Sequence, residues 1–210
     1  MQRFPGVFAM VLAVLAAGSA SAQKPGGVLK MSHFDSPASM SIHEEATAAV
    51  NRPMMGVFNN LVMYDQHVAQ TSINSIVPDL ATGWSWSEDG TELTFPLRHG
   101  VKWHDGKPFT ADDVKCTRDL LTGKSGDKLR LNPRKSWYHN LDQVTVNGDF
   151  EVTFRLKRPQ PSFIALLASG WSPVYPCHVP ARDMRTKPIG TGPFKFVVQA
   201  QRIDPRDAQS

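Results

Sequence analysis

Short stretches in which hydrophobic and polar residues alternate run through the chain, and this alternation is typical of half-buried β-strands. Residues 93–97 show it, although Pro96 among them indicates an edge strand or a bulge. Residues 144–146 and 152–156 show it on either side of Asn147-Gly148, a pair that favours a type I′ turn. The pattern therefore predicts antiparallel hairpins. Further short strands are expected at 27–34, 84–86, 100–109 and 194–198.

Other stretches have the longer period of helices. Residues 41–60 have this period and predict a helix, which Pro53 must interrupt or kink. A second helix is expected to begin after Thr110, a good N-cap residue, and to end at Gly123. A shorter helix is expected over 161–168. Helices and hairpins together predict an α+β fold.

The first 22 residues have the pattern of an export signal. Arg3 provides a weak positive region before an unbroken apolar run from 7 to 17, and Ala20-Ser21-Ala22 forms a cleavage signature before Gln23. As a helix the apolar run would span about 16 Å, far short of the roughly 30 Å of a bilayer core. A cleaved signal peptide is therefore expected rather than a membrane anchor.

Composition indicates a globular protein, because 41% of the residues are hydrophobic and 20% are charged. The formal net charge is only +4. The densest basic clusters are Arg130-Arg134-Lys135 and Lys157-Arg158. A nucleic-acid-binding protein of this size usually concentrates its charge far more, so no nucleic-acid partner is expected.

Cys116 and Cys177 are the two cysteines of the sequence. In an exported protein an even number of cysteines suggests pairing, and this bond would stabilise the fold by about 4 kcal/mol in the chain-entropy model. Two buried free thiols are the alternative, because the sequence does not show whether the two Cα atoms come within reach.

Sequence motifs of catalytic or metal centres are missing. The seven His residues include no H-E-x-x-H motif and no zinc-site spacing with a cysteine. His99 and His104 are expected to be surface imidazoles, and His43-Glu44-Glu45 an exposed polar helix turn. Gly190-Thr191-Gly192 does not match a phosphate-binding loop, because Pro193 follows it without a helix. An enzyme is not supported, and no metal or cofactor is expected.

A long run of ordered motifs lies between residues 77 and 114. The run includes Pro78-Asp79-Leu80-Ala81, Leu97-Arg98, Gly100-Val101-Lys102-Trp103 and His104-Asp105-Gly106-Lys107-Pro108-Phe109-Thr110-Ala111-Asp112-Asp113-Val114. These motifs resemble the family 5 extracellular solute-binding proteins of ABC importers, the class of peptide, dipeptide and nickel receptors. Residues 188–196 resemble the return segment of that family. The likeness covers about residues 26–198.

The resemblance implies a type II periplasmic-binding-protein-like fold, of which this chain holds the N-terminal portion with a small hairpin-rich subdomain. After a signal peptide at 1–22, it implies the first part of ligand-binding lobe I at 23–59, the small α/β subdomain at 60–185 and the return strand of lobe I at 186–198. It also implies that Trp103, His104 and Asp105 hold a turn. In this family the ligand lies between two lobes that close by a hinge.

The length of the chain departs from the family pattern. Family members are usually more than twice as long, and the second lobe is absent from this sequence. Residues 199–210 are rich in charge, with Ile203 their only large apolar residue. We expect a disordered or aberrant tail left by a frameshift or premature stop. A genuine short variant is the alternative.

A few ligand contacts transfer from the resemblance. Residues 43–47 match the region where the first lobe touches ligand, which implies Glu44, Glu45 and Thr47 as binding residues. Trp171 is a further candidate for the cleft wall. Plain solvated helix positions are the alternative for the two glutamates, and a core position is the alternative for Trp171.

The function implied by the resemblance is that of a periplasmic substrate-binding component of an ABC importer for peptides or a similar polar solute, in a truncated form that need not be functional. Its partners would be the solute and the permease and ATPase subunits at the inner membrane. The alternative is a secreted enzyme or metal-binding protein that reuses the subdomain, which would need a cluster of His, Asp or Glu in a pocket.

Overall fold

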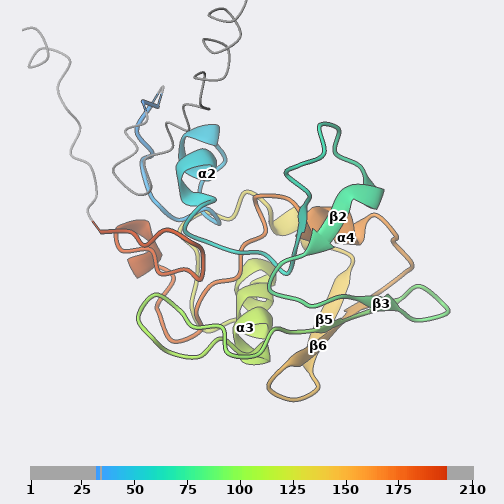
Figure 1. The fold of residues 1–210 in the computed structure, drawn as a ribbon. Coiled ribbons are helices and arrows are strands. Elements are labelled where there is room, and N and C mark those ends of the chain that lie inside the picture. Colours follow the sequence, from blue (N-terminus) through green and yellow to red (C-terminus); the bar gives the residue numbers. More distant parts are fainter. Residues whose placement is uncertain (1–31, 34, 198–210) are drawn as a thin grey trace, which may run out of the picture. The chain divides into compact units, whose positions relative to one another are not determined.

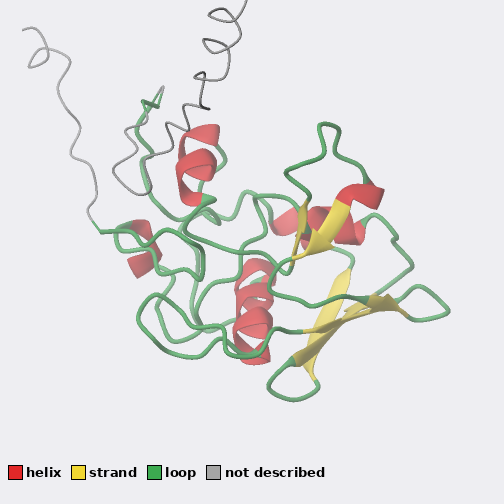
Figure 2. Cartoon of the chain, viewed as in Figure 1, coloured by secondary structure: helices red, strands yellow, loops and turns green. Residues whose placement is uncertain are grey.

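The computed structural model describes residues 32–33 and 35–197. The expected signal peptide at 1–22, almost all of the expected strand at 27–34 and the expected tail at 199–210 lie outside the described residues. Ser32 belongs to a separate N-terminal unit, and the main unit of the chain begins at His33. Figures 1 and 2 show short helices and strands in this main unit, joined by long loops.

The strands form two antiparallel sheets, and the predicted α+β class is confirmed. The smaller sheet pairs β1 (Val62–Tyr64) with β2 (Ile76–Pro78). The larger has the order β3-β4-β6-β5, with β3 at Ser85–Trp86, β4 at Glu92–Pro96, β5 at Leu141–Val146 and β6 at Glu151–Leu156. The α-helices of the described part are α2 (Ala48–Met54), α3 (Ala111–Thr122) and α4 (Phe163–Leu167). Its 3₁₀ helices are η1 (Ile73–Ser75), η2 (Lys135–Tyr138) and η3 (Asp183–Arg185).

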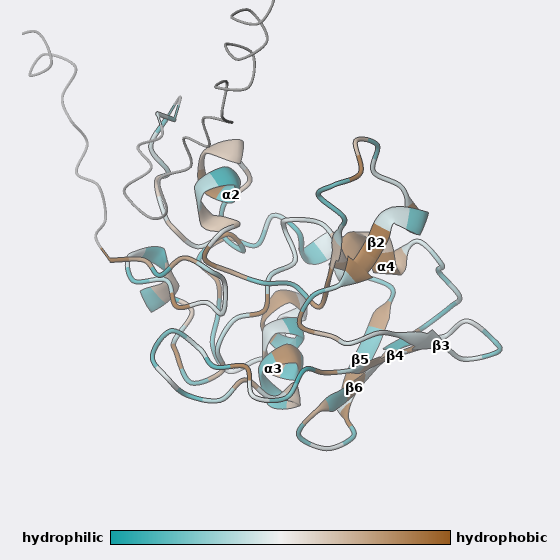
Figure 3. Cartoon of the chain, viewed as in Figure 1, coloured by the Kyte–Doolittle hydropathy of each residue, from teal (hydrophilic) through white to brown (hydrophobic). Residues whose placement is uncertain are grey.

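The larger hydrophobic core lies on one face of the four-stranded sheet. Leu93 and Phe95 of β4 and Val152 and Phe154 of β6 are fully buried, as the alternation along the chain predicts. Each such side chain stabilises the fold by roughly 1.5–3 kcal/mol when it leaves water. The amphipathic helix α3, which bears hydrophobic and hydrophilic residues in Figure 3, packs against β5 and β6.

The expectation that Pro96 marks an edge strand or a bulge is wrong. β4 lies inside the sheet, because it pairs with β6 along its whole length and with β3 at Leu93 and Thr94. Pro96 is the last residue of β4 and lies beyond the part that β3 reaches, so its missing N–H leaves no gap in the ladder. Its carbonyl accepts the N–H of Thr82 at 2.8 Å.

The β5–β6 hairpin is present, but the expected type I′ turn is wrong. That turn needs a positive φ at Asn147, and among the described residues only glycines have one. The strands are joined by the longer loop 147–150. Two carbonyls of this loop accept hydrogen bonds from other elements. The carbonyl of Asp149 accepts the N–H of Ala111 at the start of α3, and that of Phe150 accepts the N–H that follows β4, both at 2.8 Å.

The helix signals at Thr110 and Gly123 are confirmed by α3, whose C-cap glycine has a φ of 82°. The expected helix over 41–60 is largely wrong, because only α2 is helical and residues 41–47 form turns and bends instead. Pro53 lies in the last turn of α2. None of the helices in the described ranges has the length and apolar character needed to cross a bilayer.

The stretch 100–109 was expected to be a strand closed by an Asp105-Gly106 turn. The turn is present, but the strand is reduced to a single bridge between Lys102 and Pro108. The N–H of Trp103 donates to the carbonyl of Lys107 at 2.9 Å, and Gly106 between them has a φ of 90° that favours glycine. The strand expected from residue 194 is also absent as far as residue 197. There the N–H of Phe194 donates to the carbonyl of Gly56 rather than to a neighbouring strand.

The turn at 103–107 holds the segment 190–192 in place through His104. Its Nε2 bonds the carbonyl of Gly192 at 2.9 Å, while its Nδ1 accepts the N–H of Gly190 at 3.3 Å. The expectation of a surface imidazole is therefore wrong for His104, whereas His99 is exposed. Segment 190–192 also crosses the chain after α2, where the N–H of Gly192 donates to the carbonyl of Val57 at 2.9 Å.

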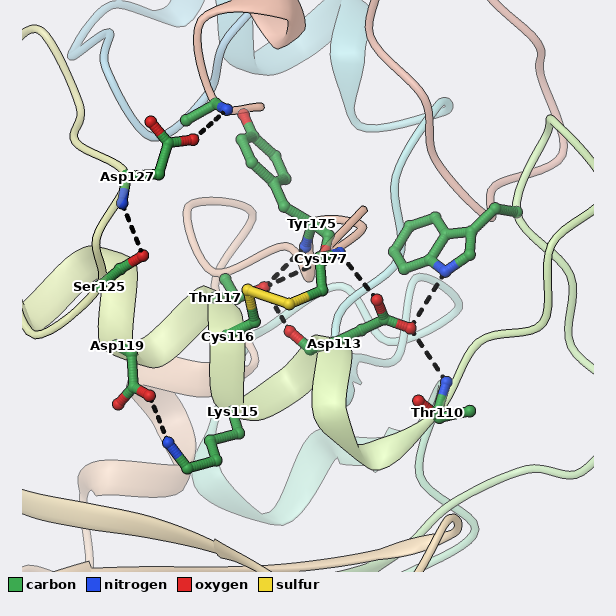
Figure 4. Close-up of a disulfide and its surroundings, with 12 residues drawn as sticks. Thr110, Asp113, Lys115, Cys116, Thr117, Asp119, Ser125, Asp127, Tyr175 and Cys177 are labelled. Carbon is green, nitrogen blue, oxygen red and sulfur yellow. Dashed lines mark hydrogen bonds and ion pairs between the residues drawn. A yellow bond between two sulfur atoms is a disulfide. The ribbon is translucent and has the colours of Figure 1, made fainter. Parts of the chain in front are cut away.

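Helix α3 holds the segment 172–178, as Figure 4 shows. Cys116 and Cys177 form a disulfide with their Cα atoms 5.7 Å apart, so of the two sequence alternatives the structure has the bond. Thr117, the next residue of α3, accepts the N–H of Tyr175 at 2.9 Å. The covalent and the hydrogen bond together tie this segment to one side of the helix.

Replacing both cysteines, as C116S/C177S, is expected to lower the free energy of unfolding by about 4 kcal/mol, because the bond closes a loop with a sequence separation of 61 residues. Urea unfolding of the oxidised chain and of the double variant measures the difference. The unmodified chain treated with a thiol reductant serves as the control and should match the variant. Equal stability of the oxidised chain and the variant would contradict the disulfide.

Replacing Gly190 by Ala is expected to destabilise the fold by about 3 kcal/mol, as overpacking of a well-packed core does. A Cβ there would lie 1.8 Å from the carbonyl oxygen of Val57, which is backbone and cannot easily move aside. Gly83→Ala is the matched control, because a Cβ at Gly83 meets nothing within 4 Å. Thermal unfolding should separate the two variants, and equal melting temperatures would refute the close crossing.

Candidate functional site

His43-Glu44-Glu45, expected to be an exposed polar helix turn, belong to a segment, 41–45, that is buried up to Glu44 and half-buried at Glu45. Ser41, His43 and Glu44 are each at most 2% exposed. The segment contacts parts of the chain that are far away in the sequence, and their carbonyls, guanidiniums and hydroxyls bond its polar groups. The polar residues of this segment are thus part of the interior.

The carboxylate of Glu44 is occupied by protein donors. Arg185 of η3 donates from Nε at 2.6 Å and from Nη2 at 2.8 Å, and the backbone N–H of Arg130 donates at 2.5 Å. The bond to Glu44 raises the pKa of Arg185. The alternative of a plain solvated position is therefore wrong for Glu44, and its oxygens already have strong partners.

The buried ring of His43, within this segment, packs against the buried ring of Tyr175. The ring centroids lie 4.3 Å apart, and Nε2 of His43 bonds the carbonyl of Pro173 at 2.9 Å. Burial lowers the pKa of His43 well below its usual range, and the positive charges of Arg118 and Arg134 lower it further. Burial also raises the pKa of Tyr175 to about 12. Both rings are therefore neutral near pH 7.

Arg134 brings Glu45 and Trp171 together. Its guanidinium lies 4.4 Å from the centre of the Trp171 ring, and its Nη2 donates to the carbonyl of Glu45 at 2.7 Å. The Glu45 carboxylate is 3.5 Å from Nη2 of Arg130. Trp171 is partly buried against a second, smaller hydrophobic cluster, which consists of Met40, Ile42, Val50, Met54, Val57, Phe58, Tyr175 and Met184. Thr47 is exposed at the N-cap of α2.

Arg130, Arg134 and Arg185 contribute to this site although the sequence does not point to them. They lie between 86 and 141 residues from the glutamate segment with which they bond. The one signal available was the basic cluster at 130–135, which carries no information about its partner. Such pairs become visible only when the fold is known.

A pocket of about 320 Å³ opens between the end of α2 and the segment 170–173. Its apolar lining includes Ile42, Met55, Phe58 and Met63, and its polar lining includes Asn59, Asn60 and Asp79. Burial raises the pKa of Asp79, whose oxygens accept from the Asn59 side chain at 2.8 Å and from the Asn60 N–H at 2.9 Å. The pocket thus offers apolar surface with a few amide and carboxylate groups, as small-molecule sites do.

The described residues do not gather three or more His, Cys, Asp or Glu side chains in a way that could hold a metal ion. The pair His178 and Asp105, 2.7 Å apart, has no third such partner among them. The polar groups of the site are amides, arginines and carboxylates that bond one another.

Comparison with known proteins places the chain in a family. The model of "Bacterial extracellular solute-binding proteins, family 5 Middle" matches residues 75–203. The dipeptide-binding protein of Escherichia coli is 30% identical over 161 residues, which is 67% of this chain and 29% of that protein. Protein XP55 of Streptomyces lividans is 29% identical over 188 residues, 85% of this chain and 33% of its own length.

Solved structures show the same likeness. The oligopeptide-binding protein AppA of Bacillus subtilis, in complex with a nonapeptide, has a TM-score of 0.67 at 28% identity, covering 81% of this chain and 34% of AppA. NikZ of Campylobacter jejuni, in complex with Ni(L-His), has a TM-score of 0.65 at 27% identity, covering 80% of this chain and 32% of NikZ.

The chain spans about a quarter to a third of the length of the curated relatives it matches. The matching part is nevertheless most of this chain, and it includes the turn at 103–107, α3 and the segment 190–192. The chain belongs to the bacterial extracellular solute-binding proteins of family 5.

Proposed function

We propose that this chain supplies one wall of the solute site of a periplasmic ABC-importer binding protein that takes up peptides or a similar polar solute. The observation that carries the proposal is the pocket of about 320 Å³ whose lining includes Gly170, the residue before Trp171, in a chain of this family. Relatives named as dipeptide-binding and oligopeptide-binding proteins support the peptide class. Export to the periplasm, with removal of residues 1–22, and delivery to permease and ATPase subunits are parts of the same proposal.

The proposed wall consists of Glu45, Thr47 and Trp171 together with the amides of Asn59 and Asn60. Peptide backbones need hydrogen-bond donors and acceptors, which side-chain amides supply in both kinds. Side chains of the solute would pack against the apolar lining that includes Met55 and Met63. Glu44 acts indirectly in this proposal, because its carboxylate is taken by Arg185 and keeps the segment 41–45 in place.

One wall alone is expected to bind weakly. Well-formed ligand sites bury about 70–90% of a ligand's surface, whereas a solute on a single wall keeps much of its surface in water. In the longer relatives the matching part is 26–33% of the protein. We therefore infer that peptides bind this chain with a Kd weaker than about 1 μM, equivalent to roughly −8 kcal/mol.

A titration of the ¹⁵N-labelled chain with a mixture of di- to pentapeptides at millimolar concentration tests the proposal. The indole N–H signal of Trp171, assigned from Trp171→Phe, and the side-chain amide signals of Asn59 and Asn60 are expected to shift. The indole of Trp86 in β3, which packs against the larger hydrophobic core, should not move and serves as an internal control. If neither the Trp171 signal nor the two amide signals shift, the proposed wall is wrong. Calorimetry tests the affinity separately, and a Kd at or below about 1 μM would refute the inference that one wall binds weakly.

A further inference from the structure

Two lysines lie at the C-terminal end of α3, and a third bonds the chain just before β5, close to the first. Nζ of Lys124 donates to the carbonyl of Asp142 in β5. Nζ of Lys157 donates at 2.9 Å to the carbonyl of His139, which precedes Asp142 by three residues. Lys135 lies over the glycine that ends α3, where a Cβ would be 3.5 Å from its Nζ. The fold thus joins the two basic clusters that are apart in the sequence.

None of these three ammonium groups forms an ion pair with a carboxylate of the described residues. The C-terminal end of a helix carries about half a negative charge, which offsets only a part of three positive charges. The cluster therefore leaves a surplus of positive charge facing water.

The stretch that holds Lys124 and Lys135 carries as much net charge as the whole chain. Residues 124–137 contain five cations and one carboxylate, so their net charge equals the +4 of all 210 residues. That carboxylate, Asp127, accepts the backbone N–H of Ala181 at 2.6 Å. We call the exposed residues Lys124, Lys128, Arg130, Lys135, Lys157 and Arg158 the basic surface. Of these six, Arg130 also forms an ion pair with Glu45.

Two large apolar side chains are exposed in the same loop. Leu131 is 60% exposed and Trp137 is 42% exposed. Trp137 is held in η2, and the guanidinium of Arg134 lies 5.9 Å from its ring centre. Tryptophan beside lysines is the combination that favours the headgroup level of a bilayer, where the ring is half in hydrocarbon and the ammonium groups meet phosphates.

We propose that the basic surface, with Leu131 and Trp137, docks on anionic phospholipid headgroups. A protein partner fits less well, because four of the six cations are lysines, which protein interfaces deplete. Nucleic acid fits less well because the whole chain carries only +4. The lysines of the basic surface and Trp137 are not residues of the proposed wall, so this docking can be tested separately from the solute site. It would hold the chain at the membrane where an importer works.

Co-sedimentation of the full chain with vesicles tests the proposal. Binding to equal parts phosphatidylglycerol and phosphatidylcholine is expected to exceed binding to phosphatidylcholine alone and to fall as salt is added. Each lysine near an anionic surface strengthens binding roughly fivefold, so K124Q/K135Q/K157Q should weaken the anionic part roughly a hundredfold. Vesicles of phosphatidylcholine alone report any binding through the apolar run at 7–17, which all variants share.

The matched control K102Q/K107Q/K187Q removes the same charge from exposed lysines outside the basic surface and should bind like the unmodified chain. A blue shift of tryptophan emission on anionic vesicles, absent in Trp137→Phe, gives a second readout. Equal losses in the two triple variants, equal binding to both lipid compositions, or equally tight binding to polyglutamate would each overturn the proposal. Circular dichroism confirms that the variants are folded.

Discussion

The buried carboxylate of Asp113 receives hydrogen bonds from three segments that the chain has to bring together. Its Oδ2 accepts the indole N–H of Trp103 at 3.1 Å and the backbone N–H of Thr110 at 3.0 Å, while its Oδ1 accepts the N–H of Cys177 at 2.8 Å (Figure 4). Asp113 is only 5% exposed. A buried carboxylate is costly without partners, so the three donors must stay in place for the fold to tolerate it.

The proposed wall depends on this arrangement through the elements next to Asp113. The segment after Trp171 is held by the bond to Cys177, by the disulfide and by Thr117, and it carries Tyr175 against His43. The turn that contains Trp103 also contains His104, which positions the segment 190–192 against the chain after α2. Both sides of the pocket are therefore connected to one helix, and a change at the start of α3 would move both.

Features set by neighbouring residues could be predicted from the sequence. Thr110 and Gly123 mark the ends of α3, and the alternation at 93–97 marks β4, because caps and half-buried strands are local. Features set by distant partners could not. Glu44 has the local pattern of a solvated residue, yet Arg185, 141 residues away, makes it an interior one.

The expected type I′ turn at Asn147-Gly148 was wrong for the same reason, because distant partners decide the loop conformation. Asn147-Gly148 favours a two-residue turn in isolation, but the carbonyls of the longer loop are needed by Ala111 and by the end of β4. The motif run at 77–114 predicted the fold class more reliably than these local patterns did. It resembles a whole family, and the fold of a family already includes its distant contacts. The pairing of that motif run with the segment 188–196 is explained by His104.

Native-state hydrogen exchange of Asp113→Asn measures the central dependence directly, with Asp112→Asn, an exposed neighbour on the same helix, as control. The amide cannot accept all three bonds, and a lost buried partner costs about 1–3 kcal/mol. The account predicts that protection of the Thr110 and Cys177 amides and of the Trp103 indole falls together, by roughly tenfold or more. It is contradicted if only the Thr110 amide loses protection, or if the two variants exchange alike.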